Sequence, residues 1–188
     1  MSKKLYKKYT KKTVTKSSDN LSSATYLIIV ESPSKCAKIE SYLGLNYCCI
    51  SSKGHIRSVN GLKSIDTKGS FEPKFTELND KKDHIVFMKQ IIAKFSKENI
   101  ILATDDDREG EAIAWHICEQ FGLPVETTPR IIFHEVTKNA LLKAVKSPIT
   151  INLDIVKAQH ARQVLDVIVG YKISPMLWKY LYNDSNNS

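Results

Sequence analysis

The fold is decided by residues 100–121, which read IILATDDDREGEAIAWHICEQF. The apolar, largely β-branched run at 100–104 is typical of a strand buried on both faces of a parallel sheet. From about Arg108 onward, apolar residues recur at helical spacing until Gly122, a common helix stop. Five carboxylates occupy the seven positions from Asp105 to Glu111, between the strand and the first turns of the helix. The stretch therefore predicts a strand, an acidic turn and a helix.

A similar unit stands near the start of the chain. The run YLIIV at 26–30 predicts a second buried strand, which ends at Glu31. Ser32 can cap a helix that begins at Pro33 and runs to about Leu43. Both units thus place an acidic residue directly after a strand.

Further elements fill the rest of the chain. We expect strands at 47–52 and 130–133, helices at 83–95 and 137–146, and a long irregular excursion at 57–82. Asp83 and Thr137 are the expected caps of the two helices. Alternating strands and helices predict an α/β fold with a mainly parallel sheet flanked by helices.

The acidic residues fall at the edge of such a sheet where ligands bind, the carboxyl ends of the strands. If the two strands are neighbours, Glu31 meets Asp105, Asp107 and Glu109, while Asp106 points elsewhere. Crowded carboxylates must take up protons or bind a cation, and their oxygens suit Mg²⁺. The alternative is an acidic helix N-terminus, which the helix dipole stabilises without any metal.

Composition narrows the class of protein. The chain has 188 residues and a formal net charge of +8. Seven lysines precede residue 25, so we expect a basic disordered tail at 1–24 that either contacts nucleic acid phosphates or serves as a solvated arm or localisation signal. The sequence has no long apolar run and its four cysteines lack a CxxC spacing, which predicts a soluble intracellular protein with free thiols and no membrane partner.

Six stretches of the chain are distinctive when taken together: VESPSKCAKI (30–39), GHIR (54–57), FEPKF (71–75), LATDDDREGEAIAWH (102–116), RIIFHEVTKNAL (130–141) and KAQHARQVLDVIVGYKISPMLW (157–178). They resemble, in the same order, the N-terminal part of type IA DNA topoisomerases of the bacterial topoisomerase I kind. Glutamate plus DxDxE alone would indicate only a Toprim domain, which primases, type II topoisomerases and some nucleases also contain.

The resemblance implies a Rossmann-like Toprim domain at 25–150, followed at 151–188 by the first helices of the family's central domain, cut short. It also implies roles for single residues. Glu31 matches the glutamate that assists proton transfer at the 3′ oxygen of the cut strand. Lys35 matches the lysine that supports the scissile phosphate and contacts DNA.

The remaining implied roles concern metal and DNA. Asp105, Asp107 and Glu109 match the acidic triad that holds Mg²⁺, with Glu31 beside them. Arg162 matches an arginine that grips single-stranded DNA, and Asp166 occupies a neighbouring matched position.

Three aromatic or histidine side chains carry weaker expectations. Trp115 and Trp178 lie in helical patterns and are expected in the core. His160 is expected to be a packed or surface helical residue.

The nucleophile of the family has no match, because none of the eight tyrosines stands in a tyrosine–arginine motif. One hypothesis is therefore a Toprim part of a type IA topoisomerase, which relaxes negative supercoils with Mg²⁺ and without ATP at a single-stranded region of duplex DNA. This chain alone would be inactive, as a fragment or the product of a split gene whose tyrosine region is on a separate chain. The alternatives are a stand-alone DNA-binding or regulatory Toprim module and a small Toprim nuclease.

Overall fold

The computed structural model of the protein describes residues 23–183, so the predicted basic tail at 1–24 lies almost wholly outside the described residues. A parallel sheet in the order β2-β1-β5 forms its centre. The strands are β1 (Tyr26–Val30), β2 (Tyr47–Ser51) and β5 (Ile100–Ala103). The predicted α/β class with parallel strands is confirmed.

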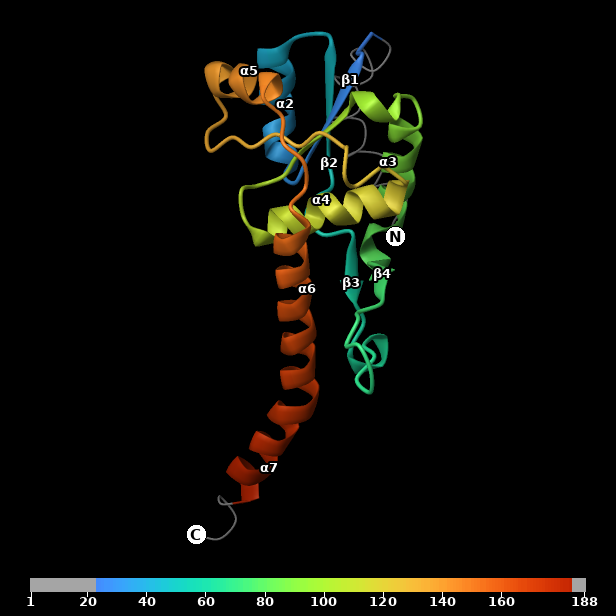
Figure 1. Ribbon diagram of the computed structural model, residues 1–188, viewed down its shortest axis with the longest axis vertical. Coiled ribbons are helices and arrows are strands. Elements are labelled where there is room, and N and C mark those ends of the chain that lie inside the picture. The colour runs from blue at the N-terminus through green and yellow to red at the C-terminus, as the bar shows by residue number, and fades with distance from the viewer. Residues whose placement is uncertain (1–22, 184–188) are drawn as a thin grey trace, which may run out of the picture.

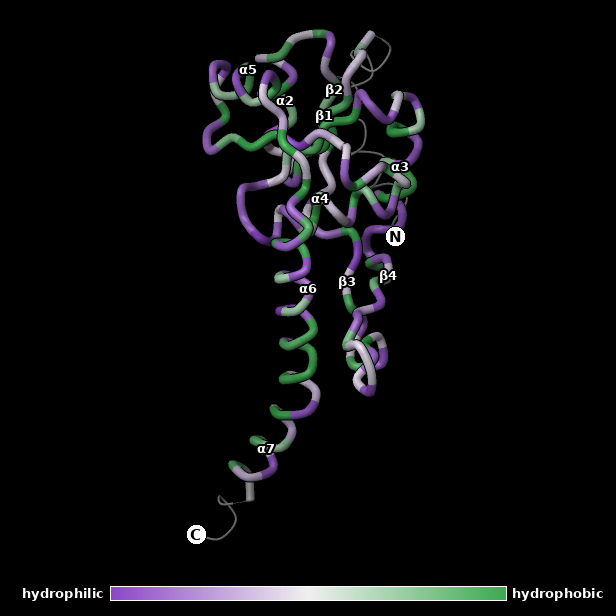
Figure 2. The backbone as a smooth tube through the Cα atoms, in the orientation of Figure 1, coloured by the Kyte–Doolittle hydropathy of each residue, from purple (hydrophilic) through white to green (hydrophobic). Residues whose placement is uncertain are grey.

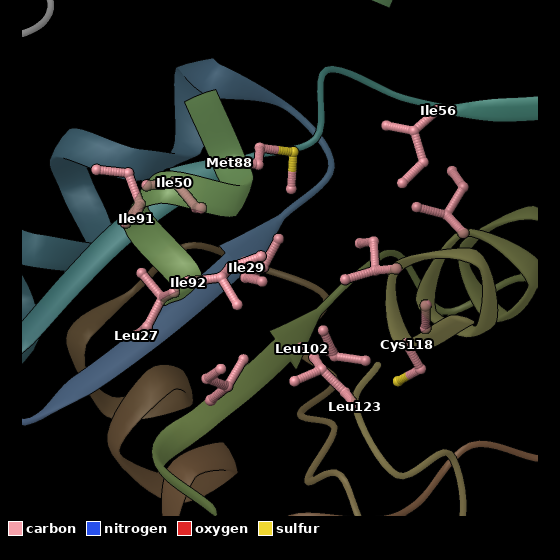
Figure 3. Close-up of a cluster of buried hydrophobic side chains, with 14 of the residues drawn as sticks. Leu27, Ile29, Ile50, Ile56, Met88, Ile91, Ile92, Leu102, Cys118 and Leu123 are labelled. Carbon is pink, nitrogen blue, oxygen red and sulfur yellow. The ribbon is translucent and has the colours of Figure 1, made fainter. Parts of the chain in front are cut away.

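Helices cover both faces of this sheet (Figure 1). They are α2 (Pro33–Leu43), α3 (Lys82–Ile92), α4 (Arg108–Phe121) and α5 (Lys138–Lys146). Alternate strand residues face opposite layers, because successive side chains of a strand point to opposite sides. Leu27 and Ile29 pack with Met88 of α3, in the cluster that Figure 3 shows. Ile28 instead packs on the other face, in a cluster with residues of α2 and α5.

The helix ends show which local signals hold. Gly44 ends α2 with a φ of +85°, and Gly122 ends α4 with a φ of +65°; both values favour glycine. At the start of α5, the Thr137 hydroxyl accepts a hydrogen bond from the backbone N–H of Ala140, so the predicted cap is present. The Ser32 hydroxyl, by contrast, makes no capping bond. The prediction that Asp83 caps α3 is wrong, because the helix begins at Lys82 and Asp83 lies within its first turn.

The predicted strand at 130–133 is also wrong. Only Arg130 forms bridges, to Leu102 on one side and to Ile149 on the other. The chain leaves the sheet after Ile131, and the next two residues are half-buried. Because one residue alone pairs with both neighbouring segments, no continuous ladder of backbone hydrogen bonds forms, and the segment is not a strand.

The excursion at 57–82 is less irregular than predicted. It contains an antiparallel pair, β3 (Arg57–Val59) with β4 (Phe75–Glu77), which we call the hairpin. Each strand has only three residues, too few for a recognisable alternation in the sequence.

The C-terminal helices project away from the sheet (Figure 1). Helix α6 (Leu153–Ile168) continues through a π-helical segment, η4 (Val169–Ile173), into α7 (Ser174–Asn183). We call residues 26–151 the body and 153–183 the rod. Trp178 on the rod is 58% exposed, so its predicted core position is wrong, whereas Trp115 packs against the core as expected. None of the helices in the described range 23–183 has the length and apolarity that a membrane crossing requires.

Candidate functional site

The two acidic segments meet at one edge of the sheet. Strands β1 and β5 are hydrogen-bonded neighbours, with Val30 opposite Ala103. Glu31 and Asp105 follow these strands directly or after one residue. The two strands are therefore neighbours, which the predicted convergence of Glu31 and Asp105 required.

Electrostatics shows that the carboxylates influence one another. Burial raises the pKa of the Glu31 carboxyl above its ordinary value, and the charges of Asp105, Asp107 and Glu109 raise it further. Lys35 acts in the opposite direction. Glu31 consequently holds a proton more readily than an isolated glutamate does.

Lys35 reaches across from α2 to the acidic turn. Its ammonium donates to Oδ1 of Asp105 and forms an ion pair with it. Beside Lys35, the hydroxyls of Ser32 and Ser34 are hydrogen-bonded to each other at 2.8 Å. The first turn of α2 thus presents a cation and two hydroxyl groups to the edge of the sheet.

Asp107 serves the helix as well as the site. Its carboxylate accepts a hydrogen bond of 2.7 Å from the backbone N–H of Gly110 and so caps α4. A side chain at Gly110 would place its Cβ 2.1 Å from the carbonyl oxygen of Asp105. Gly110 is therefore needed for the acidic turn to fold against its helix, a role that the sequence reading missed.

A buried ion pair beneath the turn was also missed. Arg130 Nη1 lies 2.7 Å from Glu111 Oε2, and both side chains are at least 95% buried. Arg130 Nη2 also donates to the carbonyl oxygen of Asp105 at 2.9 Å, and Glu111 accepts from the backbone N–H of Asn152 at the start of α6. The pair therefore connects the acidic turn to the rod. A charged Glu111 on the apolar face of α4 is the signal that could have revealed it.

The donor set fits a magnesium ion in its chemistry, because the negative charges of Asp105, Asp107 and Glu109 raise the pKa of Glu31, and carboxylate oxygens are the ligands that a hard cation prefers. Across residues 23–183, however, no three His, Cys, Asp or Glu side chains are grouped closely enough to hold an ion. Lys35 contacts Asp105, and Asp107 caps α4. Asp106 lies 3.8 Å from exposed His134, away from the others, as predicted.

Arg162 and Asp166 are not brought to this edge by any ion pair in the described part of the chain. They lie exposed on α6, 3.9 Å from each other. His160, on the same helix, packs against Phe75 of the hairpin with ring centroids 4.6 Å apart, which agrees with the expected packed histidine.

His116 on α4 joins His160 in this packing. It is fully buried, and burial, with smaller effects from His160, Arg57 and His55, lowers its pKa to about 3. Among residues 23–183, neither of its ring nitrogens has a hydrogen-bond partner. The sequence reading did not single out this residue.

Comparisons with known proteins agree with this geometry. The model of the Toprim domain family matches residues 26–136. The structure of full-length topoisomerase I from Thermotoga maritima is 40% identical and superposes with a TM-score of 0.73, covering 81% of this chain and 26% of that protein. The chain thus spans about a quarter of the length of that relative. It belongs to the Toprim family, and it corresponds to the Toprim portion of a type IA topoisomerase.

Proposed function

We propose that this chain supplies the Toprim part of a type IA DNA topoisomerase, which cuts one DNA strand, passes DNA through the break and rejoins it. The reaction relaxes negative supercoils with Mg²⁺ and without ATP. One observation carries the proposal: Glu31 lies within the electrostatic reach of Asp105, Asp107 and Glu109 at the carboxyl ends of neighbouring strands. Lys35 stands beside them.

In this proposal Asp105, Asp107 and Glu109 would hold Mg²⁺, and Glu31 lies within the reach of their charges. When bound, the ion supplies positive charge that offsets the negative charge of the reacting phosphate. Lys35 already neutralises one carboxylate of the turn, and it is placed to donate to a phosphate oxygen. The positive groups also allow DNA to approach a cluster of carboxylates.

Glu31 transfers a proton to and from the 3′ oxygen of the cut strand. A tyrosine hydroxyl gives up its proton to solvent and its oxygen attacks phosphorus to form a 5′ phosphotyrosine bond, while the bond to the 3′ oxygen breaks; on rejoining, the tyrosine oxygen leaves and takes a proton back from solvent. The carboxylic acid of Glu31 donates its proton to the leaving 3′ oxygen and takes it back when the strand is rejoined. Its raised pKa suits this exchange, because a proton donor must retain its proton until the bond breaks.

The attacking tyrosine comes from outside the matched region, either from the remainder of a longer protein or from a separate chain. We also assign Arg162, with Asp166 beside it, to the grip on single-stranded DNA. Both side chains are exposed on the rod and are free to contact a strand that approaches the body.

The test is relaxation of negatively supercoiled plasmid with Mg²⁺ and without ATP, by this chain alone and with a tyrosine-bearing fragment of a related topoisomerase. Relaxation only in the mixture is expected. The Glu31→Gln variant should abolish it, while Asp106→Asn, a matched carboxylate that faces away, should retain it. Relaxation by the chain alone would place the nucleophile among its own tyrosines, and nicking without rejoining would favour a nuclease.

Magnesium binding is tested separately by calorimetric titration. Replacing Asp105 and Asp107 together by asparagine should weaken binding by more than the ~10-fold that loss of an outer-shell partner causes. Asp106→Asn is again the control and should leave the affinity unchanged. Equal affinities in all three proteins would contradict the assigned metal ligands.

A further inference from the structure

Lys53 stands on the β2 side of Glu31 in an unusual backbone conformation. Its φ is +59°, in the left-handed region that favours glycine. Two hydrogen bonds hold it there: its N–H donates to Ser51 Oγ at 2.9 Å, and its carbonyl accepts from Lys81 Nζ at 2.8 Å. The fold thus keeps Lys53 at a position that an unconstrained lysine avoids.

The same loop is fixed to the backbone of Glu31. The N–H of Gly54 and the hydroxyl of Ser51 both donate to the Glu31 carbonyl oxygen, each at 3.2 Å. Lys53 and Glu31 also line one open cavity of about 390 Å³, together with Ser32, Pro33 and Gly54. Lys53 therefore borders the same cavity as Glu31.

Lys53 and Lys81, which lies just before α3 and contacts the loop, carry charge that the described residues do not neutralise. Between residues 23 and 183, no carboxylate lies within 4.0 Å of the ammonium of Lys53 or of Lys81. Both charges also lower the pKa of the neighbouring His84, after the larger effect of burial. Lys35 differs, because Asp105 neutralises it.

The order of the sheet places these cations on two sides of Glu31. Strand β1, which Glu31 follows, lies between β2 and β5. Lys53 follows β2, whereas Asp105, which pairs with Lys35 of α2, follows β5. A strand that crosses Glu31 would meet the unneutralised charge of Lys53 on the β2 side and the Lys35–Asp105 ion pair on the β5 side.

We propose that Lys53 and Lys81 bind phosphate groups of the DNA strand next to the phosphate that is cut, and so fix the register of the strand across Glu31. The inference rests on the proposed function, because it takes single-stranded DNA as the ligand. Two lysines without a carboxylate partner, one of them at the wall of a cavity, are suited to a polyanion, and each phosphate contact releases a counterion.

The experiment measures binding of the full 188-residue chain to a labelled single-stranded oligothymidine by fluorescence anisotropy, in EDTA and at several KCl concentrations. The plot of log affinity against log salt has a slope of about 0.7 per phosphate contact on single strands. Lys53→Met combined with Lys81→Met should therefore reduce the slope by about 1.4. Lys53→Arg, which keeps the charge, should retain the wild-type slope.

Lys97 provides the matched control. Its ammonium also donates to a backbone carbonyl, that of Gly122, at 2.7 Å, but it precedes β5 and so lies at the opposite end of the sheet. Lys97→Met should leave the slope unchanged. An equal loss in this variant would overturn the inference, since charge alone would then explain the effect.

Lys53→Gly separates a binding role from a structural one. Glycine adopts positive φ without cost, so this variant should unfold at the same or a higher temperature while it binds DNA more weakly. If Lys53 had only a structural role, the unfolding temperature and the DNA affinity would decrease together. If the wild type binds and the double variant has the same slope, the inference fails and the proposed function stands. If the wild type does not bind single-stranded DNA at all, both fail.

Discussion

The body and the rod use apolar side chains in opposite ways. Residues 27–30 of β1 are 0% exposed between two layers of helices, whereas Leu165 and Leu177 on the rod are 59% and 57% exposed. Figure 2 shows hydrophobic residues along both regions. The difference teaches that apolar periodicity predicts a helix, while burial depends on a second element facing it. The rod meets such elements along α6, which packs on α4 and contacts β3, and there Val156 and Val164 are buried.

The ion pairs of the body and the rod also differ in burial. The body holds the Arg130–Glu111 pair, which is almost fully buried, and the rod holds the Arg162–Asp166 pair, which is exposed to solvent. A buried charge depends on its partner far more than an exposed one, because water no longer stabilises it.

The largest predicted effect follows from this pair. Arg130→Met leaves the Glu111 carboxylate buried without its partner and should lower the free energy of unfolding by about 3 to 5 kcal/mol. Arg162→Met removes an exposed partner and should cost less than about 1 kcal/mol. Urea denaturation followed by tryptophan fluorescence measures both.

A second variant keeps this prediction testable if Arg130→Met does not fold. Replacing both partners, Arg130→Met with Glu111→Leu, should recover much of the lost stability, because no unpaired charge stays buried. Equal costs for Arg130→Met and Arg162→Met would remove the distinction between the two regions.

Acid should weaken the body through His116. Its pKa in the folded chain is about 3, against an ordinary value of 6.5, so below pH 6.5 the unfolded chain binds a proton that the folded chain does not. The free energy of unfolding should therefore fall as pH drops from 6.5 toward 3, by up to about 1.4 kcal/mol per pH unit. Glu31, with its raised pKa, acts in the opposite sense.

His116→Phe isolates this contribution, because the replacement keeps an aromatic ring in the cluster with Phe75. Urea denaturation at pH 7, 6 and 5 should give a shallower pH dependence than in the wild type. Parallel curves for the two proteins would show that His116 is protonated at the same pH in the folded and unfolded chains.

Glycines give a third contrast between the regions. Gly110→Ala in the body brings a Cβ within 2.1 Å of the Asp105 carbonyl oxygen, so the turn must shift, at about 1 to 3 kcal/mol. Gly170→Ala in the rod meets no atom of residues 23–183 within 4 Å beyond its chain neighbours and its own helix backbone, and it should raise helix content, with up to about 1 kcal/mol in helix propensity. Unfolding and circular dichroism test the two variants, and destabilisation by both would mean that the rod is packed around Gly170.

The sequence correctly predicted those features that depend on residues close together along the chain. Helix ends at Gly44 and Gly122 and the cap at Thr137 depend on residues a few positions apart, and the structure confirms them. The three-residue strands of the hairpin and the isolated bridges of Arg130 depend on distant partners. The sequence reading therefore missed the hairpin and wrongly predicted a strand at 130–133.

The candidate site divides in the same way. Glu31 and Asp105 were found because each follows a recognisable strand, and their adjacency needed only the order of the sheet. The Arg130–Glu111 pair joins residues 19 positions apart, and Gly110 matters through its contact with a folded turn. Neither relation leaves a periodic pattern in the sequence.

The smallest predicted effect compares two adjacent residues of the rod. Val164 is 7% exposed and Leu165 is 59% exposed, so their side chains leave the same helix toward the body and toward solvent respectively. Val164→Ala should cost about 1 to 2 kcal/mol of unfolding free energy, reduced by the better helix propensity of alanine. Leu165→Ala should stay within about 0.5 kcal/mol. Similar costs at both positions, measured by urea denaturation, would mean that another surface covers Leu165 in solution, and the rod would then be stabilised as the body is.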